Sequence, residues 1–250
     1  MGGFGRPTTL ERVFRRTLVI PVIALGLAAS ACGTSDDDRR DPLPPLPDVD
    51  PPVAAAAAPM VNGRVDTAWL KASSKATGIP PRVLSAYITA VARANAAEPR
   101  CELAWNTVAA IGRIESVHGA VNGSRIHSDG VARPRIRGIA LDGDGVRAIS
   151  DTDDGDLDGD RTWDRAVGPM QFIPTTWSQW GSDGDGDGRS NPQDVDDAAL
   201  AAGRYLCRSG KQLGSRNGWL RAVVTYNQSA AYVRKVSRTA TGYADDASRA

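Results

Sequence analysis

Apolar residues recur at helical spacing through most of residues 66–237, and this pattern predicts a mainly helical domain. The expected helices are residues 66–77, 81–95, 103–118, 174–181, 194–207 and a last one within 219–236. Gly78, Gly119 and Gly181 stand at three of the predicted ends, where glycine commonly follows a helix. The apolar face of each segment therefore predicts several helices packed around one core.

The middle of the chain, residues 120–165, breaks this pattern with a stretch rich in Gly and Asp. It holds only short β-like pieces, such as residues 135–139. Helices on both sides of an irregular, loop-rich middle predict an α+β fold that is predominantly helical and has little sheet. No internal repeat is visible.

The N-terminal 31 residues have the features of a secretory signal peptide. Four Arg precede an apolar run at residues 17–29, and small residues then lead to Cys32. This order resembles a lipoprotein signal in which Cys32 carries the lipid, although Ala29 stands where Leu is usual. The alternative is secretion after Ala31 without a lipid. In both cases we expect an exported protein of the cell envelope.

Composition divides the remaining chain into three parts. Residues 32–65 are rich in Pro, Ala and Asp with almost no large apolar residues, which predicts a semi-rigid tether. Residues 66–237 form the folded domain, and residues 238–250 are expected to be a flexible tail. With a lipid on Cys32, the tether would hold the domain away from the outer face of the cytoplasmic membrane.

The charge balance argues against a nucleic-acid partner. The 250 residues carry 30 Lys+Arg and 29 Asp+Glu, a net charge of +1. Without residues 1–31, which hold four Arg and one Glu, 26 basic and 28 acidic residues remain, a net charge of −2. Such a chain has no basic excess for a phosphate backbone. A single apolar stretch also excludes a polytopic membrane protein, and we expect a monomer.

The cysteines form an even pair once Cys32 is set aside. Cys101 and Cys207 remain, and an exported protein works where disulfides persist. The alternative is two free buried thiols. We predict a Cys101–Cys207 disulfide that closes a loop of more than a hundred residues.

Glu115 is the acidic residue most suited to catalysis. Val108, Ile111 and Glu115 share one face of the helix expected at residues 103–118, so the carboxyl falls at an apolar position. Burial and the negative end of the helix both oppose ionisation, which predicts a raised pKa and a general acid. Alternatively, Glu115 reaches solvent at a frayed helix end, or pairs with Arg113 or Arg125.

Four motifs in order resemble the lytic murein transglycosylases, in particular the family B type in its actinobacterial, exported form. These are Ile114-Glu115-Ser116, residues 168–172 (GPMQF), the segment from Asp197 to Leu206, and Tyr226-Asn227. They cover residues 81–236. The resemblance implies a lysozyme-like fold, in which a helix carries the Glu and a Gly-x-x-Gln turn lies near it.

The resemblance also implies a reaction on peptidoglycan glycan strands. Glu115 would protonate the oxygen between N-acetylmuramic acid and N-acetylglucosamine, and the substrate's 2-acetamido group would relieve the developing charge. The Glu115 carboxylate would then deprotonate the C6 hydroxyl, closing a 1,6-anhydro ring, so one carboxyl serves both steps. By the same carry-over the substrate-binding residues are Ser116, Met170, Gln171, Tyr205, Tyr226 and Asn227.

Residues 183–194 (DGDGDGRSNPQD) match a twelve-residue calcium loop. The expected ligands are the side chains of Asp183, Asp185, Asp187 and Asp194 and the carbonyl of Arg189, with Asn191 at the ninth position. Asp194 replaces the usual Glu at position 12, so binding would be weaker or shift toward magnesium. We expect the ion to be structural, and we expect no organic cofactor.

The sequence is compatible with alternatives at two points. The Asp-rich loop at residues 142–160 either is a solvated surface loop, binds a second ion or supplies a second carboxylate. The alternatives to a lytic transglycosylase are a hydrolytic muramidase and a non-catalytic, calcium-stabilised module that binds the cell wall.

Overall fold

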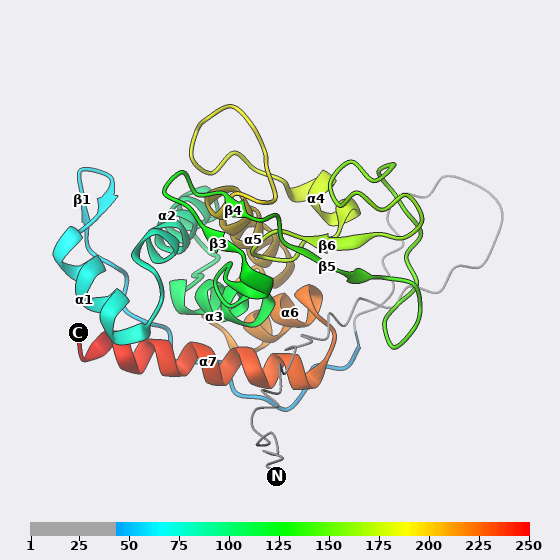
Figure 1. The fold of residues 1–250 in the computed structure, drawn as a ribbon. Helices are drawn as coiled ribbons and strands as arrows, with labels where there is room; N and C mark the ends of the chain where they lie inside the picture. Colours follow the sequence, from blue (N-terminus) through cyan, green and yellow to red (C-terminus); the bar gives the residue numbers. More distant parts are fainter. Residues whose placement is uncertain (1–43) are drawn as a thin grey trace, which may run out of the picture.

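The computed structural model describes residues 44–250, and the predicted signal peptide and Cys32 lie outside them. Helices dominate and the strands are two to four residues long, so the predominantly helical α+β class is confirmed (Figure 1). The α-helices are α1 (Thr67–Thr77), α2 (Pro81–Ala97), α3 (Trp105–Ser116), α4 (Pro174–Trp180), α5 (Val195–Gly210), α6 (Arg216–Tyr226) and α7 (Ala230–Ser248).

Helix α3 is the centre of the core. All of its residues except Arg113 are buried, which is unusual for a helix and means that neighbours cover it on every side. Helix α7 packs along α3 and reaches α1 with its C-terminal end, while α5 packs against α2 and α6 (Figure 1). A fully enclosed helix gives its side chains fixed positions, because almost none of them can relax into solvent.

The helix starts follow from local sequence. Asp66, Asp194, Ser215 and Ser229 cap α1, α5, α6 and α7 through side-chain oxygens that accept backbone N–H groups. Helix α2 begins at Pro81, whose fixed φ suits the first turn. The boundaries predicted for α1, α4 and α5 agree with the structure to within a few residues.

The strands make three antiparallel pairs with no shared sheet. They are β1 (Met60–Val61) with β2 (Arg64–Val65), β3 (Arg125–Ile126) with β4 (Ala132–Arg133), and β5 (Arg137–Ala140) with β6 (Arg165–Val167). A short 3-10 helix, Val121–Gly123, precedes β3. The β5–β6 pair carries the Asp-rich loop at its far end and leads directly into the turn at residues 168–172.

The C-terminal prediction is wrong in two respects. The apolar stretch at residues 219–236 is two helices, because the chain becomes extended at Asn227 and Ser229 starts a new helix. The flexible tail expected at residues 238–250 continues α7 to Ser248. Ala240, Tyr243 and Ala244 are buried and prolong the apolar face of that helix, which holds the segment on the domain.

The predicted tether is also wrong for its second half. Asn106 of α3, fully buried, accepts the Ala55 N–H and donates to the carbonyl of Val53. The Trp105 indole donates to the carbonyl of Ala56 at 3.2 Å. This strap, residues 49–58, is therefore held mainly through its backbone, a kind of binding that its side-chain composition does not reveal.

The predicted disulfide is confirmed. Cys101 and Cys207 are bonded, with Cα atoms 5.1 Å apart. The bond links the segment that leads into α3 to the last turns of α5.

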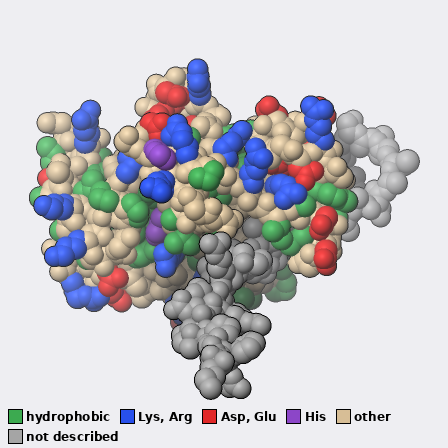
Figure 2. All heavy atoms as spheres, in the orientation of Figure 1, with side chains coloured by type: hydrophobic (Ala, Val, Ile, Leu, Met, Phe, Trp, Pro, Cys, Tyr) green, Lys and Arg blue, Asp and Glu red, His purple; other side chains and the backbone are tan. Residues whose placement is uncertain are grey.

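Charged side chains are dispersed over the face of the molecule in Figure 2. Figure 2 shows Lys and Arg spread across one face with Asp and Glu among them, not gathered into a basic patch. Within residues 44–250, no helix combines the length and the apolar character needed to cross a membrane.

Candidate active site

Glu115 lies in the last turn of α3 and is only 8% exposed. The prediction that this carboxyl points into the interior is confirmed. Among the described residues it forms no ion pair, so the alternatives of Arg113 and Arg125 as partners are not what the structure shows. A buried carboxyl without a cation costs free energy when ionised, which is unusual outside functional sites.

Its partner is Tyr232, a residue that the sequence did not single out. The Tyr232 hydroxyl donates to Glu115 Oε1 at 2.5 Å, and both side chains are buried. Tyr232 lies in the first turn of α7, three residues after the capping Ser229. That cap was the available signal, because it marks a new helix whose first turn faces α3.

These surroundings set the charge of Glu115. Burial raises its pKa to about 7, while the Tyr232 hydrogen bond and the positive charge of Lys235 act in the opposite direction. No Asp or other Glu of the described chain has a resolved influence on this carboxyl. Glu115 can therefore give and take a proton near neutral pH.

The turn at residues 168–172 follows β6 and is closed by backbone hydrogen bonds. Val167 and Phe172 exchange both of their N–H···O bonds, and the Gln171 N–H reaches the Gly168 carbonyl. Gly168 has a φ of 76°, and a side chain there would collide with the carbonyl oxygen of Pro192. Only glycine allows this close approach, so the turn is pinned against the segment that precedes α5.

This turn also contacts the helices on either side. Ser116 Oγ donates to the Pro169 carbonyl at 2.6 Å, and the Tyr226 hydroxyl donates to the Met170 carbonyl at 2.7 Å. Ser116 and Met170 are fully buried, so neither reaches a ligand from these positions. In this structure they contact the turn beside Glu115, and their role in substrate binding stays a prediction.

The other predicted residues keep some access to solvent. Gln171 is half-buried at a φ of 52°, and its side-chain amide donates to the Gly168 carbonyl at 3.0 Å. Tyr205 and Tyr226 are half-buried with ring centroids 5.9 Å apart. Asn227 is 7% exposed, and its Oδ1 accepts the Ser229 N–H just before α7.

Tyr226 is the predicted binding residue that the structure connects to the acid. Its pKa is raised well above the usual value, first by burial and then by the charge of Glu115. The structure thus brings Glu115, Tyr226 and the turn together. Tyr205 contacts this group through the ring of Tyr226.

Another contact outside the predictions fixes the end of α3. Val117, His118 and Gly119 all have positive φ, a costly run for the two non-glycine residues. His118 is buried between two hydroxyls, with Nε2 2.7 Å from Tyr243 and Nδ1 3.2 Å from Tyr87. Burial lowers the pKa of His118 to about 3, so the ring is neutral. These contacts tie the turn after Glu115 to α2 and α7.

The predicted calcium loop brings three of its carboxylates together. Oxygens of Asp183, Asp185 and Asp187 lie within 4.8 Å of one another. The Asp183 carboxylate also accepts the N–H groups of Gly186 and Gly188, which curl the loop around it. Such a set of oxygen ligands fits a hard divalent cation.

Asp194, the ligand predicted at the twelfth position, is not part of this group of carboxylates. Its carboxylate caps α5 by accepting the Asp196 N–H at 2.8 Å. Asp197 closes the loop in its place, accepting the N–H groups of Gly184 and Asn191. The side chain that sequence spacing assigned to the ion, Asp194, is thus the N-cap of α5.

The Asp-rich loop between β5 and β6 is folded and not simply solvated. Asp158 and Asp164 are buried, and Asp164 accepts both the N–H and the hydroxyl of Thr152. The carboxylates that converge are Asp151, Asp153 and Asp164. The side chain of Asp164 is thus hydrogen-bonded within the loop region. None of the loop's Asp residues is among the causes of the raised pKa of Glu115.

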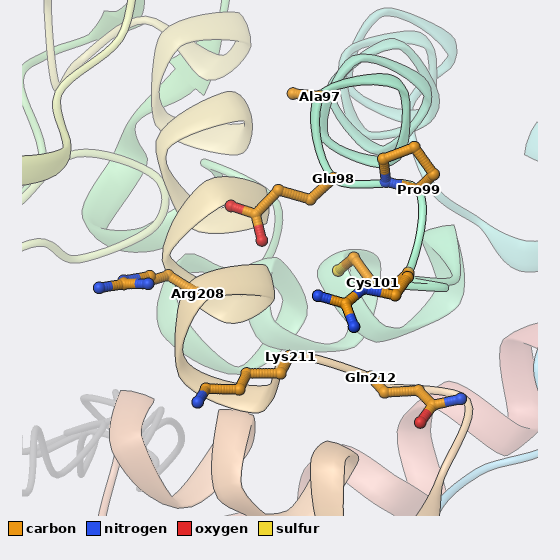
Figure 3. Close-up of a pocket in the computed structure, with 8 residues that line it drawn as sticks. Ala97, Glu98, Pro99, Cys101, Arg208, Lys211 and Gln212 are labelled. Atoms are coloured by element: carbon orange, nitrogen blue, oxygen red, sulfur yellow. The ribbon is translucent and has the colours of Figure 1, made fainter.

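Glu115 does not line either of two hollows in the described part of the chain. One, of about 590 Å³, lies beside the disulfide at the C-terminal ends of α2 and α5 and is lined by Glu98, Arg100, Arg208 and Lys211 among others (Figure 3). The other, of about 530 Å³, lies between α1, α3 and α7 and includes Arg113 and Lys235. Cys101 precedes the first turn of α3 and Glu115 lies in its last, roughly 15 Å along the helix, so the first hollow is remote from the acid.

Comparison with known proteins gives one family and one solved structure. The family described as "Transglycosylase SLT domain" matches residues 92–241. The structure is SltB3 from Pseudomonas aeruginosa in complex with NAG-anhNAM-pentapeptide, at 17% identity and a TM-score of 0.38. That match covers 71% of this chain and 66% of SltB3, less than two thirds of its length. No curated protein matches the chain significantly.

Proposed function

This chain belongs to the transglycosylase SLT domain family, and from this premise we propose that it is a lytic transglycosylase of peptidoglycan, of the family B type in its exported form. The observation that carries the proposal is Glu115. It is a buried carboxyl whose pKa is raised to about 7, held by Tyr232 beside the turn at residues 168–172. The mainly helical domain with α3 at its centre fits the lysozyme-like fold of this family.

In the proposed reaction Glu115 acts twice. Protonated, it gives its proton to the glycosidic oxygen between N-acetylmuramic acid and N-acetylglucosamine, and the bond from that oxygen to C1 breaks. The substrate's 2-acetamido oxygen attacks C1 and carries the positive charge that develops. The Glu115 carboxylate then removes the C6 hydroxyl proton, and O6 displaces the acetamido oxygen to give 1,6-anhydro-N-acetylmuramic acid.

The single carboxylate supports this route over one with two acids. Glycosidases that use a carboxylate nucleophile place it roughly 5 Å from the acid, where each charge would shift the other's pKa. Among the described residues no second carboxylate has a resolved effect on Glu115. Tyr232 donates to Oε1, which leaves Oε2 to exchange the proton.

The test is the mass of the products released from purified sacculi. We expect anhydro muropeptides, and a Glu115→Gln chain should lose about two to four orders of magnitude in turnover while it still binds glycan. Products with reducing ends would instead show a hydrolytic muramidase. A parent chain that binds glycan but releases no product from sacculi would show a wall-binding module.

We further propose that a structural Ca²⁺ is held by Asp183, Asp185 and Asp187, with the Arg189 carbonyl as another ligand. The ion would offset the repulsion among three carboxylates and fix the loop between α4 and α5. Ca²⁺ should raise the melting temperature and a chelator should lower it, whereas Asp185→Asn should abolish the difference. A melting temperature that ignores millimolar Ca²⁺ would contradict the site.

We also propose export by residues 1–31 and lipid attachment at Cys32, which would place the domain outside the cytoplasmic membrane. Labelling of the parent chain with a palmitate analogue, and loss of the label in Cys32→Ala, would support the anchor. A labelled Cys32→Ala chain would contradict it.

A further inference from the structure

The structure separates the Trp residues that a glycan could touch from those it could not. Three of the six are buried and lie in the core: Trp105, Trp177 and Trp219. Three are half-buried: Trp69, Trp163 and Trp180. The fully buried rings are excluded as sugar platforms, because stacking needs access to the ring face, and the half-buried ones remain as candidates.

Trp180 differs from the other two in what its ring contacts. It is the last residue of α4, and its ring centroid lies 5.4 Å from that of Tyr205 on α5. The Tyr205 ring centroid lies 5.9 Å from that of Tyr226. Tyr226 donates to the Met170 carbonyl in the same turn that Ser116, the residue after Glu115, contacts through Pro169. Trp180, Tyr205 and Tyr226 therefore form an aromatic row that begins beside the acid and ends two rings away.

The other half-buried Trp residues are not in this row. Trp69 of α1 packs edge-on against Trp105 at 6.1 Å, on the part of the domain where the strap lies. Trp163 pairs through its backbone with Ser150 in the Asp-rich loop. Within residues 44–250, Trp180 is thus the half-buried Trp that ring contacts connect to Tyr226.

The row suits an extended β-1,4-linked glycan. Pyranose rings present C–H groups on their faces and hydroxyls at their edges, so half-buried aromatic rings can pack on the faces and leave the edges in water. Each step along the row is comparable to the length of one sugar ring. A chain cleaved at Glu115 could therefore place a more distant sugar over Trp180.

We propose that Trp180 is a stacking platform for a sugar ring remote from the bond that is cleaved, and that it makes the protein favour long N-acetylated glycan strands over short ones. The assignment of the strand to peptidoglycan rests on the proposed function. Contacts far from the reacting atoms stabilise ground state and transition state alike. Trp180 therefore sets the affinity and KM for long strands and leaves kcat nearly unchanged.

The test measures binding without turnover. In a Glu115→Gln chain, a hexamer of β-1,4-linked N-acetylglucosamine is titrated by calorimetry. Trp180→Ala should weaken hexamer binding about tenfold, a typical size for one aromatic stack. Trp163→Ala, the matched control, should bind like its parent.

Two further substitutions guard against a folding defect. Trp180→Leu keeps apolar contact with Tyr205 but has no flat ring, so it should bind as weakly as Trp180→Ala. Trp180→Phe restores a ring and should recover most of the affinity. Hexamer binding that Trp180→Leu leaves unchanged, or no hexamer binding by the parent, would overturn the proposal.

The kinetic comparison uses the chain with Glu115 intact. With long glycan strands, Trp180→Leu should raise KM about tenfold with kcat within about twofold. If the parent releases no anhydro product, the proposed function fails, yet Trp180-dependent hexamer binding would still stand. If the parent is active and Trp180→Leu has the same KM as the parent, this inference alone fails.

Discussion

Burial and one hydroxyl act on the Glu115 carboxyl in opposite directions. Burial favours the protonated form and raises the pKa, whereas the Tyr232 O–H favours the carboxylate to which it donates. The pKa of about 7 is the outcome of this opposition, with Lys235 adding to the lowering side. A general acid that must also act as a base needs such a balance, since neither form may be too stable.

Removing the Tyr232 hydroxyl should therefore change the pH profile. In Tyr232→Phe the carboxylate loses its donor, so the pKa of Glu115 rises further. The first step needs protonated Glu115, and activity falls as the pH rises through this pKa. The alkaline limb of kcat should then move to higher pH, while kcat itself drops by roughly ten- to a hundredfold from lost orientation.

Tyr243→Phe is the matched control for this variant. Tyr243 is a second buried tyrosine of α7, but its hydroxyl contacts His118 and not Glu115. It should affect stability without moving the alkaline limb. A limb that moves equally in both variants would show that Tyr232 does not act directly on the acid.

Glu115 should also make stability depend on pH. Its pKa is about 7 in the folded chain and ordinarily 4.5, so the unfolded chain gives up this proton at lower pH. The free energy of unfolding should fall as the pH rises from 4.5 to 7, by about 3 kcal/mol for this group. Glu115→Gln should remove that fall, measured as the difference between the two chains in denaturant unfolding at pH 5 and pH 8.

At the residue scale, sequence spacing located the acid but not its partner. Glu115 stands at an apolar helical position after Val108 and Ile111. Its burial can therefore be predicted from the local sequence, without knowing which distant segments cover it. Tyr232 meets it across a separation of 117 residues, through the packing of α7 on α3. Such a contact depends on where helices pack, which local pattern does not determine.

At the element scale, the turn at residues 168–172 is the most constrained part of the site. Gly168→Ala should destabilise the chain by roughly 2 to 5 kcal/mol, because the new methyl group meets the Pro192 carbonyl at a positive φ. Turnover should fall as well, since Met170 and Gln171 would move. Thermal melting and the sacculus assay measure the two effects.

Gly63→Ala separates steric collision from backbone strain. Gly63 has nearly the same φ, 75°, but has open space where a side chain would lie. Its loss should be only about 1 to 2 kcal/mol, with turnover unchanged. Equal losses in the two variants would mean that the contact with Pro192 contributes nothing.

Helix ends with local signals were predictable, and segments held by tertiary contacts were not. Helix α1 starts after Asp66 and ends before Gly78, as expected. The end of α7 was missed because its polar composition hid an apolar face at Ala240, Tyr243 and Ala244, although these continue the helical spacing of Val233 and Val236. The strap was missed because Asn106 binds its backbone.

At the scale of the whole molecule, one covalent bond closes most of the domain. The Cys101–Cys207 disulfide spans 106 residues, a loop that contains α3, the turn, the Asp-rich loops and most of α5. The double variant Cys101→Ala, Cys207→Ala should lose about 4 kcal/mol in denaturant unfolding, since the unfolded chain regains the freedom of that loop. An unchanged midpoint would show that helix packing alone sets the stability.

The strap also determines how far the domain can stand from an anchor. Leu46 packs against the core, Asp48 pairs with Arg216 of α6, and the Asp50 carbonyl accepts a hydrogen bond from Ser237 of α7. The chain is therefore in contact with the domain from residue 46 onward. A lipid on Cys32 would lie 14 residues before Leu46, at most roughly 50 Å of fully extended chain. A tether continuing to residue 65 would have allowed about twice that radius. The domain would then act on the glycan layer nearest the membrane. Lengthening the chain between Cys32 and Leu46 should increase the distance from the membrane at which it can cleave glycan.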